Sequence, residues 1–395
     1  MTSKAFDVVV VGGGVIGSAI AYFLSNRPDF TGSIAVIERD QTYEYASAPR
    51  SLGGVRQQFT TPENIKISQY TAEFLAEIGD LLEVDGDRPD VGFKKQGYLF
   101  LGTPGMEDGM RRIHDIQRRE SAPVTLLDAG AMAEKFPWLN LEGISLGSYG
   151  TANEGWIDPF ALLQAFRRKA RALGATYFDD EAVGMDRNGG KVSAVHLKGG
   201  ETLSAGIVVN AAGYRGGKVA AMAGTDLPVR PRKRSVFVVD IKEQIPDHPL
   251  LIDHTGVYWR PEGQYFVCGK SPDEEEDVDV EDDDFEVDHA WFENEIWPVM
   301  AERCSKFEAL KVVNFWAGMY DMNLFDHNAV IGPHPEITNL FFANGFSGHG
   351  IQQSPAVGRA LSELIAAGKF ETLDLSAFRF DRIAAGEKFL EEAVV

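Results

Sequence analysis

The chain has 395 residues, a length at which one polypeptide commonly forms two structural domains with large apolar cores. Its formal net charge of -21 repels phosphate backbones and anionic membrane surfaces, so the composition disfavours binding to nucleic acid or to a membrane. Cys268 and Cys304 are the only cysteines, without zinc-type spacing, so we expect no disulfide scaffold, no metal site and a reducing, cytoplasmic location.

The first informative motif is a glycine turn between an apolar strand and a helix. Residues 6–11 are apolar enough for a buried strand, and a helix is expected to begin near Val15. Between them, Gly12 permits a tight turn and Gly14 lets a pyrophosphate approach the backbone. Gly17 lets the helix pack closely on the strand, and the phosphates would lie at the positive end of the helix.

A second apolar run, residues 34–37, ends at Glu38, about 20 residues after Gly17. At this offset a dinucleotide-binding βαβ unit delivers an acid to the ribose hydroxyls. A transmembrane helix over residues 6–24 is the alternative, but Asp7 and the consecutive glycines disfavour it. The motif therefore predicts a dinucleotide site and no membrane span.

The elements expected further along the chain interleave helical and extended patterns. In chain order they are a helix at 65–78, a strand at 94–101, helices at 109–120, 128–136 and 158–173, strands at 175–178 and 192–197, a strand ending in glycine within 206–213, an antiparallel sheet between 229 and 267, a strand at 340–343 and a helix at 354–367. The acidic run 273–286 is expected to be a solvated loop because its carboxylates repel one another. A partner-docking surface or a cation site is the alternative for this run.

Residues 345–351 form a second glycine-rich turn, placed after the expected strand 340–343 and before the C-terminal helix. Backbone N–H groups beside a helix N-terminus can hold negative charge. One nucleotide needs one phosphate turn, so the second turn favours a flavin, whose N1–C2=O region becomes anionic on reduction. The alternative is a glycine corner that only turns the chain.

Three ordered motifs resemble the D-amino-acid oxidase/sarcosine oxidase family of FAD enzymes. They are the N-terminal fingerprint, the strand end 210–213 and the turn 345–351 followed by Gln352. Within the family, residues 317–333 look closest to the FAD-dependent oxidoreductase domain-containing protein 1 group. The resemblance covers nearly the whole chain. It implies an α/β fold, with a Rossmann-type, glutathione-reductase-like FAD-binding domain and an α+β substrate domain built on a mixed or antiparallel sheet.

The resemblance also implies how the chain is divided. The FAD-binding domain would comprise residues 1–90, 150–225 and 325–395, and the substrate-binding domain residues 91–149 and 226–324. The residues that the resemblance places around FAD are Gly12, Gly14, Val15, Ile16, Gly17, Glu38, Arg39, Ser47, Ser51, Gly53, Gly54, Val183, Ala211, Gly213, Gly318, Gly348, His349, Gly350, Ile351 and Gln352.

Four positions depart from well-known branches of the family. Gly318 stands where monomeric sarcosine oxidase has the cysteine that attaches flavin, and Ser51 lies near the histidine that dimethylglycine dehydrogenase uses. The resemblance therefore implies a noncovalent FAD. Gln352 and Phe59 stand where sarcosine oxidase has the lysine and arginine that clamp the substrate carboxylate. The substrate of that branch is therefore not carried over to this chain.

Other side chains are candidates for binding the substrate and for catalysis. Arg56 lies in the turn expected over the flavin, and Arg260 follows Tyr258 on a strand expected over the same cavity. Either guanidinium could bind a carboxylate bidentately, and Tyr258 could orient an amine. His349 and Gln352 could act beside the ring. The alternatives are a surface salt bridge for Arg260, simple packing for Tyr258 and a structural role for His349.

We therefore expect an FAD-dependent oxidoreductase that oxidises the C–N bond of an amino acid or secondary amine. Hydride would pass to flavin N5, the imine would hydrolyse, and oxygen or an electron carrier would take the electrons. Three alternatives stay open: an NAD-dependent dehydrogenase, an FAD-dependent 2-hydroxy acid dehydrogenase, and a non-catalytic flavoprotein that assists assembly of a respiratory complex through the acidic loop.

Overall fold

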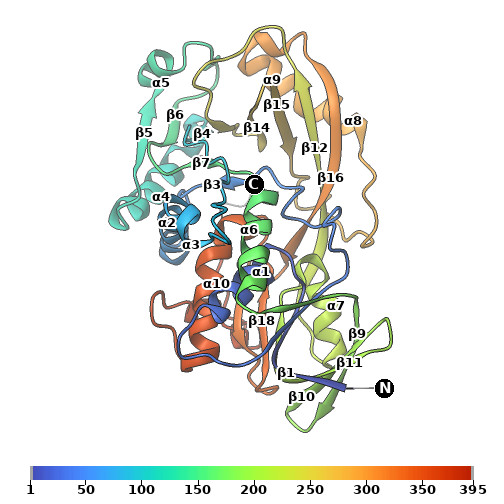
Figure 1. The fold of residues 1–395 in the computed structure, drawn as a ribbon. Helices are drawn as coiled ribbons and strands as arrows, with labels where there is room; N and C mark the ends of the chain where they lie inside the picture. Colours follow the sequence, from blue (N-terminus) through green and yellow to red (C-terminus); the bar gives the residue numbers. More distant parts are fainter. Residues whose placement is uncertain (1–2, 393–395) are drawn as a thin grey trace.

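The fold is that of a computed structural model, which describes residues 3–392 and contains two eight-stranded sheets (Figure 1). In spatial order the first sheet contains β17 (Val330–Pro333), β18 (Leu340–Asn344), β11 (Thr202–Asn210), β1 (Ser3–Val11), β2 (Ile34–Glu38) and β8 (Thr176–Asp179), with β10 (Lys191–Leu197) and β9 (Ala182–Asn188) attached at β11. β18, β11, β1, β2 and β8 are parallel, so their carboxyl ends meet at one edge. That edge is where a parallel α/β sheet binds its ligand.

Both faces of the first sheet are covered. On one face lie α1 (Val15–Ser25), α6 (Pro159–Ala172) and α10 (Gly350–Ala367), with α2 (Pro62–Ala76) and α3 (Ile78–Leu81) beyond them. On the other face lies α7 (Gly216–Met222). Because the central strand is buried on both sides, residues 8–11 are a continuous run of valines rather than an alternating pattern.

The second sheet is mixed and mostly antiparallel. Its order is β16 (Lys311–Asn323), β12 (Val229–Asp240), β15 (Tyr265–Lys270), β14 (Val257–Glu262), β13 (Leu250–Ile252), β4 (Tyr98–Gly102), β6 (Leu146–Gly150) and β5 (Val124–Asp128). β12 pairs with β16 from Val229–Asn323 to Asp240–Lys311. Val229 packs in a core of the first sheet, whereas Phe237 packs in the core of the second, so this long pair joins both sheets (Figure 1).

Short elements complete the chain. They are β3 (Gly54–Val55) paired with β7 (Gly155–Trp156), α4 (Glu107–Arg119), α5 (Ala129–Lys135), α8 (His289–Trp291), α9 (Trp297–Arg303), α11 (Asp381–Ala385), the 3-10 turns η1 (Pro104–Met106), η2 (Gly213–Arg215), η4 (Ser305–Phe307) and η5 (Ser376–Phe378), and the π-helical turn η3 (Phe292–Ile296). Across residues 3–392, no helix combines the length and the apolar character that crossing a bilayer requires.

Most expected elements are present, with shifted ends. The helix predicted at 65–78 breaks into α2 and α3 near Glu77, and β4 begins at Tyr98 because Lys94 makes only an isolated bridge. The C-terminal helix begins at Gly350 rather than at 354, so the end of the glycine turn forms its first turn. The strands of the first sheet fall within 1–90, 150–225 and 325–395, and we propose the domain division on that basis.

Candidate active site

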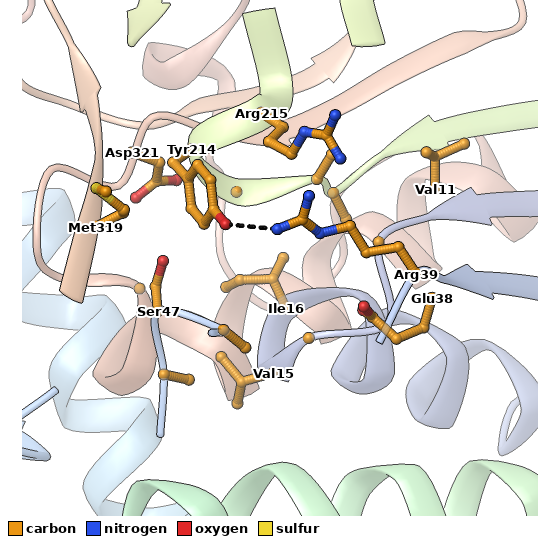
Figure 2. Close-up of a pocket in the computed structure, with 18 of the residues that line it drawn as sticks. Val11, Val15, Ile16, Glu38, Arg39, Ser47, Tyr214, Arg215, Met319 and Asp321 are labelled. Atoms are coloured by element: carbon orange, nitrogen blue, oxygen red, sulfur yellow. Dashed lines mark hydrogen bonds between the residues drawn. The ribbon is translucent and has the colours of Figure 1, made fainter. Parts of the chain in front are cut away.

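A large cavity lies at the carboxyl edge of the first sheet, between the turn after β1 and the ends of β2 and β11 (Figure 2). We call it the channel. Its empty space is about 1310 Å³, open solvent at the mouth included. The residues predicted to bind FAD that line it are Gly12, Gly14, Val15, Ile16, Glu38, Arg39, Ser47, Ser51, Ala211, Gly213, Gly348, Gly350 and Ile351.

The three fingerprint glycines have different surroundings. Gly12 has a φ of +103°, and a Cβ there would lie 2.3 Å from the Ala211 carbonyl oxygen. A Cβ at Gly17 would lie 1.9 Å from the carbonyl oxygen of Gly12, so these two glycines are required by the protein's own packing. A Cβ at Gly14, which lines the channel, would meet no atom within 4 Å. The space beside Gly14 is therefore available to a ligand, as a pyrophosphate site requires.

Glu38 and Arg39 stand where β2 ends at the channel (Figure 2). The Glu38 carboxylate accepts hydrogen bonds from the backbone N–H groups of Gly13, at 2.9 Å, and Asp40, at 3.0 Å. Burial raises the pKa of Glu38. Arg39 donates a 2.9 Å hydrogen bond from Nη2 to the hydroxyl of Tyr214, which lies in η2 after β11. This bond joins the two sides of the channel.

Of the residues predicted to contact FAD, two line neither the channel nor the second cavity that adjoins it. Val183 is half exposed, while its neighbours Glu181 and Ala182 line the wall. Successive side chains of a strand point to opposite faces, which directs Val183 away from the channel. Gly17 lies behind Gly12 and is needed for packing rather than for the wall.

A second cavity adjoins the channel, and we call it the inner cavity. Its empty space is about 790 Å³, open solvent included. It shares Ser47, Ser51, Met319, Tyr320, Gly348 and Ile351 with the channel. The remaining predicted residues that line it are Gly53, Gly54, Arg56, Tyr258, Gly318, His349 and Gln352. Residues from both halves of the chain therefore meet where the two cavities join.

Arg56 is buried at the wall of the inner cavity, and both departures from the sarcosine oxidase clamp contact it. The Gln352 Oε1 atom accepts a 2.8 Å hydrogen bond from the Arg56 backbone N–H. The Arg56 guanidinium lies 4.1 Å from the centre of the Phe59 ring. His349 Nε2 is 3.0 Å from Arg56 Nη2, and the Gln58 carbonyl accepts from Nη1. Gln352 and Phe59 thus hold one arginine in place.

Glu154 is a buried acid behind Arg56 that the sequence analysis missed. Its carboxylate accepts hydrogen bonds from the Gln57 backbone N–H, at 2.7 Å, and from Gln58 Nε2, at 2.8 Å. Burial raises the pKa of Glu154 to about 7. Glu154 lies in the short connection between β6 and β7 and belongs to no recognisable motif. The sequence feature that could have drawn attention to Glu154 is the neighbouring Gly155, where a Cβ would lie 1.8 Å from the Lys94 carbonyl oxygen.

Arg260 was expected on a strand over the cavity, but it is not among the residues that line the channel or the inner cavity. Its Nε donates to the Leu52 carbonyl at 2.9 Å, and its Nη1 donates to the Pro261 carbonyl and to Glu262. The side chain therefore anchors the Leu52 segment. Tyr258, two residues earlier, does line the inner cavity, and burial raises the pKa of its hydroxyl.

The second glycine turn is partly closed to ligands. The Asp321 Oδ2 atom accepts hydrogen bonds from the backbone N–H groups of Gly345, at 3.0 Å, and Phe346, at 3.1 Å. Burial raises the pKa of Asp321 to about 6. The later residues Gly348 and Gly350 line the channel at the N-terminus of α10. Only that later part presents a helix N-terminus to a ligand.

The acidic run 273–286 is a loop and most of its carboxylates are exposed, as expected, but Asp277 and Asp282 are partly buried in ion pairs. The side chain of Asp277 is 13% exposed, and its carboxylate forms two 2.7 Å hydrogen bonds with Arg234 of β12. Asp282 lies 2.8 Å from both Arg215 and Lys218, which line the channel. Basic side chains near the two cavities thus offset the repulsion among these carboxylates.

The dinucleotide turn, the adjoining inner cavity and the glutathione-reductase-like α/β fold define the class of protein. Residues 7–364 match the model of the FAD dependent oxidoreductase family, DAO, and the chain belongs to that family. FAD is the cofactor of this family, and the channel fits it: Gly14 leaves room for the pyrophosphate and Glu38 is placed for the ribose. The expected family, fold class and cofactor are therefore confirmed.

Individual relatives are similar over nearly the whole chain. FAD-dependent oxidoreductase domain-containing protein 1 of Xenopus laevis is 44% identical, over 98% of this chain and 85% of that protein. Glycine oxidase of Bacillus licheniformis is 27% identical, over 96% of this chain and 98% of its own length. The crystal structure of L-proline dehydrogenase from P. horikoshii superimposes with a TM-score of 0.86 and 27% identity, over 98% of this chain and 100% of that chain.

Proposed function

We propose that this protein oxidises the C–N bond of an amino acid or secondary amine, with noncovalently bound FAD. The observation that carries the proposal is the buried Arg56 guanidinium in a cavity that adjoins the FAD channel. A guanidinium binds a carboxylate strongly in a site shielded from water. Glycine oxidase and L-proline dehydrogenase, by their names, act on amino acids, which supports this substrate class.

The residues of the inner cavity have distinct tasks in this proposal. Arg56 binds the substrate carboxylate, and its contacts with Gln352 and Phe59 fix its direction. Burial raises the pKa of both Tyr258 and Tyr320, so their hydroxyls stay protonated and can hydrogen-bond the neutral amine. The apolar side chains Val236, Leu250 and Ile252 line the same cavity and limit the entry of water.

Bound FAD supplies an acceptor for two electrons and the hydrogen of the carbon next to nitrogen. The nitrogen lone pair then forms the C=N bond of an imine. Water adds to this imine and releases a carbonyl compound together with ammonia or an amine. Oxygen or an electron carrier takes the electrons in the second half of the reaction.

The proposal is tested by mixing the holoenzyme anaerobically with amino acids, N-alkyl amino acids and 2-hydroxy acids while following the visible absorbance of FAD. Amines should bleach the flavin and release ammonia or an amine. Bleaching by hydroxy acids alone would favour a 2-hydroxy acid dehydrogenase, and no bleaching by any compound would favour a non-catalytic flavoprotein. Admission of air then distinguishes an oxidase from a dehydrogenase.

Arg56→Gln tests the role of the guanidinium. Loss of hydrogen bonds to a charged group should lower kcat/KM for a carboxylated amine about 10- to 100-fold. Arg232→Gln is the matched control, because Arg232 lies on the second sheet and outside the residues lining the inner cavity. Equal kcat/KM values for the Arg56 variant and the parent would contradict the assignment.

A further inference from the structure

The acidic loop, residues 273–286, connects β15 to α8 without a helix or strand of its own. Its aspartates face a basic run on β12, where four of the five residues 230–234 are arginine or lysine. The ion pairs between them are Asp277 with Arg234, Asp279 with Arg232 and Asp284 with Lys233. These pairs attach the loop to the second sheet.

Asp282 of the same loop is attached to a wall of the FAD channel instead. Its Oδ2 atom lies 2.8 Å from Arg215 Nε and 2.8 Å from Lys218 Nζ, and both of these basic residues line the channel (Figure 2 labels Arg215). The side chain of Asp282 is only 14% exposed, so its carboxylate is largely shielded from water. One end of the loop is thereby fastened to η2 and α7, on the β11 side of the channel.

Phe285, three positions later, contacts the segment that lines the channel after β2. The centre of its ring lies 4.7 Å from that of Tyr45, a residue of the channel wall. The Arg50 guanidinium lies over both rings, 4.8 Å from the centre of Tyr45 and 4.9 Å from that of Phe285. Arg50 is itself held by the carbonyls of Glu44 and Ala317, each at 2.6 Å. Phe285 therefore docks on a fixed part of this wall.

The two attachments lie on opposite sides of the channel. Asp282 holds residues that follow β11, and Phe285 holds a residue that follows β2. In the first sheet β1 separates these strands, so about 10 Å lies between them. Three residues of extended chain span about the same distance. The loop between Asp282 and Phe285 therefore runs from one wall of the channel to the other.

We infer that the acidic loop is a strap that retains FAD in the channel, fastened to one wall by Asp282 and to the other by Phe285. FAD leaves when the two walls separate, and the strap resists that separation. Asp282 and Phe285 are positioning residues in this arrangement, because they act through the wall residues that they hold. The inference concerns the cofactor, so it does not depend on which substrate the enzyme oxidises.

The rate of FAD release tests the inference without turnover. Holoenzyme is diluted into buffer without FAD, and the appearance of free flavin is followed by fluorescence. Asp282→Asn removes the charge that holds Arg215 and Lys218, and release should become about 3- to 10-fold faster. If Asp282 only neutralised these two basic residues, the variant would free them to attract the FAD pyrophosphate, and release would slow. Slower or unchanged release therefore overturns the inference.

Phe285→Ala and the double variant test whether the two attachments act as one strap. Phe285→Ala removes the contacts with Tyr45 and Arg50 and should also speed release about 3- to 10-fold. A strap opens when either end is free, so the double variant should release FAD at most about twofold faster than the faster single variant. Effects that multiply in the double variant would show two independent contacts and contradict a single strap.

Asp283→Asn is the matched control. Asp283 is exposed, lies beside Asp282 and forms none of the ion pairs named above, so its replacement removes the same charge from the loop without unfastening it. Release from this variant should match release from the parent. If Asp283→Asn speeds release as much as Asp282→Asn does, the charge of the loop rather than its attachment is responsible, and the inference is overturned. Tm and the visible spectrum of bound FAD verify that each variant is folded.

Discussion

Replacing Glu154 by glutamine is expected to change how the stability of the protein depends on pH. Glu154 is fully buried and its carboxylate contacts Gln57 and Gln58, whose segment supports Arg56. Burial raises its pKa from 4.5 to about 7. A carboxyl with a raised pKa keeps its proton in the folded protein at pH values where the unfolded chain has already lost it.

The sign and size of the effect follow from this shift. Between pH 4.5 and about 7 the folded state binds one more proton at Glu154 than the unfolded state does, so the free energy of unfolding falls as pH rises. Each pKa unit corresponds to about 1.4 kcal/mol, which makes the total loss about 3 kcal/mol. The contribution is complete below pH 4.5 and is lost once the pH has risen through about 7. Glutamine does not titrate and lacks this dependence.

The assay is urea unfolding of parent and Glu154→Gln protein, saturated with FAD, at several pH values from about 5 to about 8. The free energy of unfolding of the parent should fall by about 3 kcal/mol relative to the variant across this range. Glu73→Gln, at an exposed position of α2, should follow the parent. A difference between parent and Glu154→Gln that stays constant with pH would show that Glu154 is charged throughout, and would refute the reasoning.

Two further predictions concern the FAD channel. Gly14→Val should lower the ratio of bound FAD to protein with little loss of stability, because the valine side chain enters the open space of the channel. Gly17→Ala should instead cost about 1–3 kcal/mol of stability, because the new Cβ collides with the Gly12 carbonyl. Equal FAD content in Gly14→Val and parent would contradict the first. Tyr214→Phe removes the hydrogen bond that Arg39 donates across the channel, and FAD should then be released about five times faster during dialysis against buffer without FAD. An unchanged release rate would show that this bond does not retain the cofactor.

Features encoded by adjacent residues were predictable from the sequence. The fingerprint at Gly12 specifies a turn that few sequences can form, and the strand, helix and acid beside it follow within one βαβ unit. The turn at 345–351 was found in the same way. Arg56 was found because it follows a recognisable glycine pair, Gly53-Gly54, although the support of its guanidinium by Phe59 required the structure.

Features made by distant residues were missed or misread. The acidic run was correctly expected to be an exposed loop, but the sequence did not predict that Asp277 pairs with Arg234, which precedes it by more than 40 positions on β12. Arg260 was expected at the cavity wall, yet Leu52, from another part of the chain, takes its Nε–H. Neither contact leaves a local pattern, because each depends on how the second sheet packs against the segment after Ser47.

The long β12–β16 pair has a consequence for how the two sheets are held together. Its hydrogen-bonded register continues from the core of the first sheet to that of the second. Because both strands of the ladder run through the two cores, the sheets are tied by a continuous two-stranded ribbon rather than by flexible linkers. The acidic loop lies beside this ladder, where Asp277 pairs with Arg234 of β12 and Asp282 pairs with Arg215. Salt, which screens charges, is therefore expected to loosen the acidic loop before it disturbs the join between the two sheets.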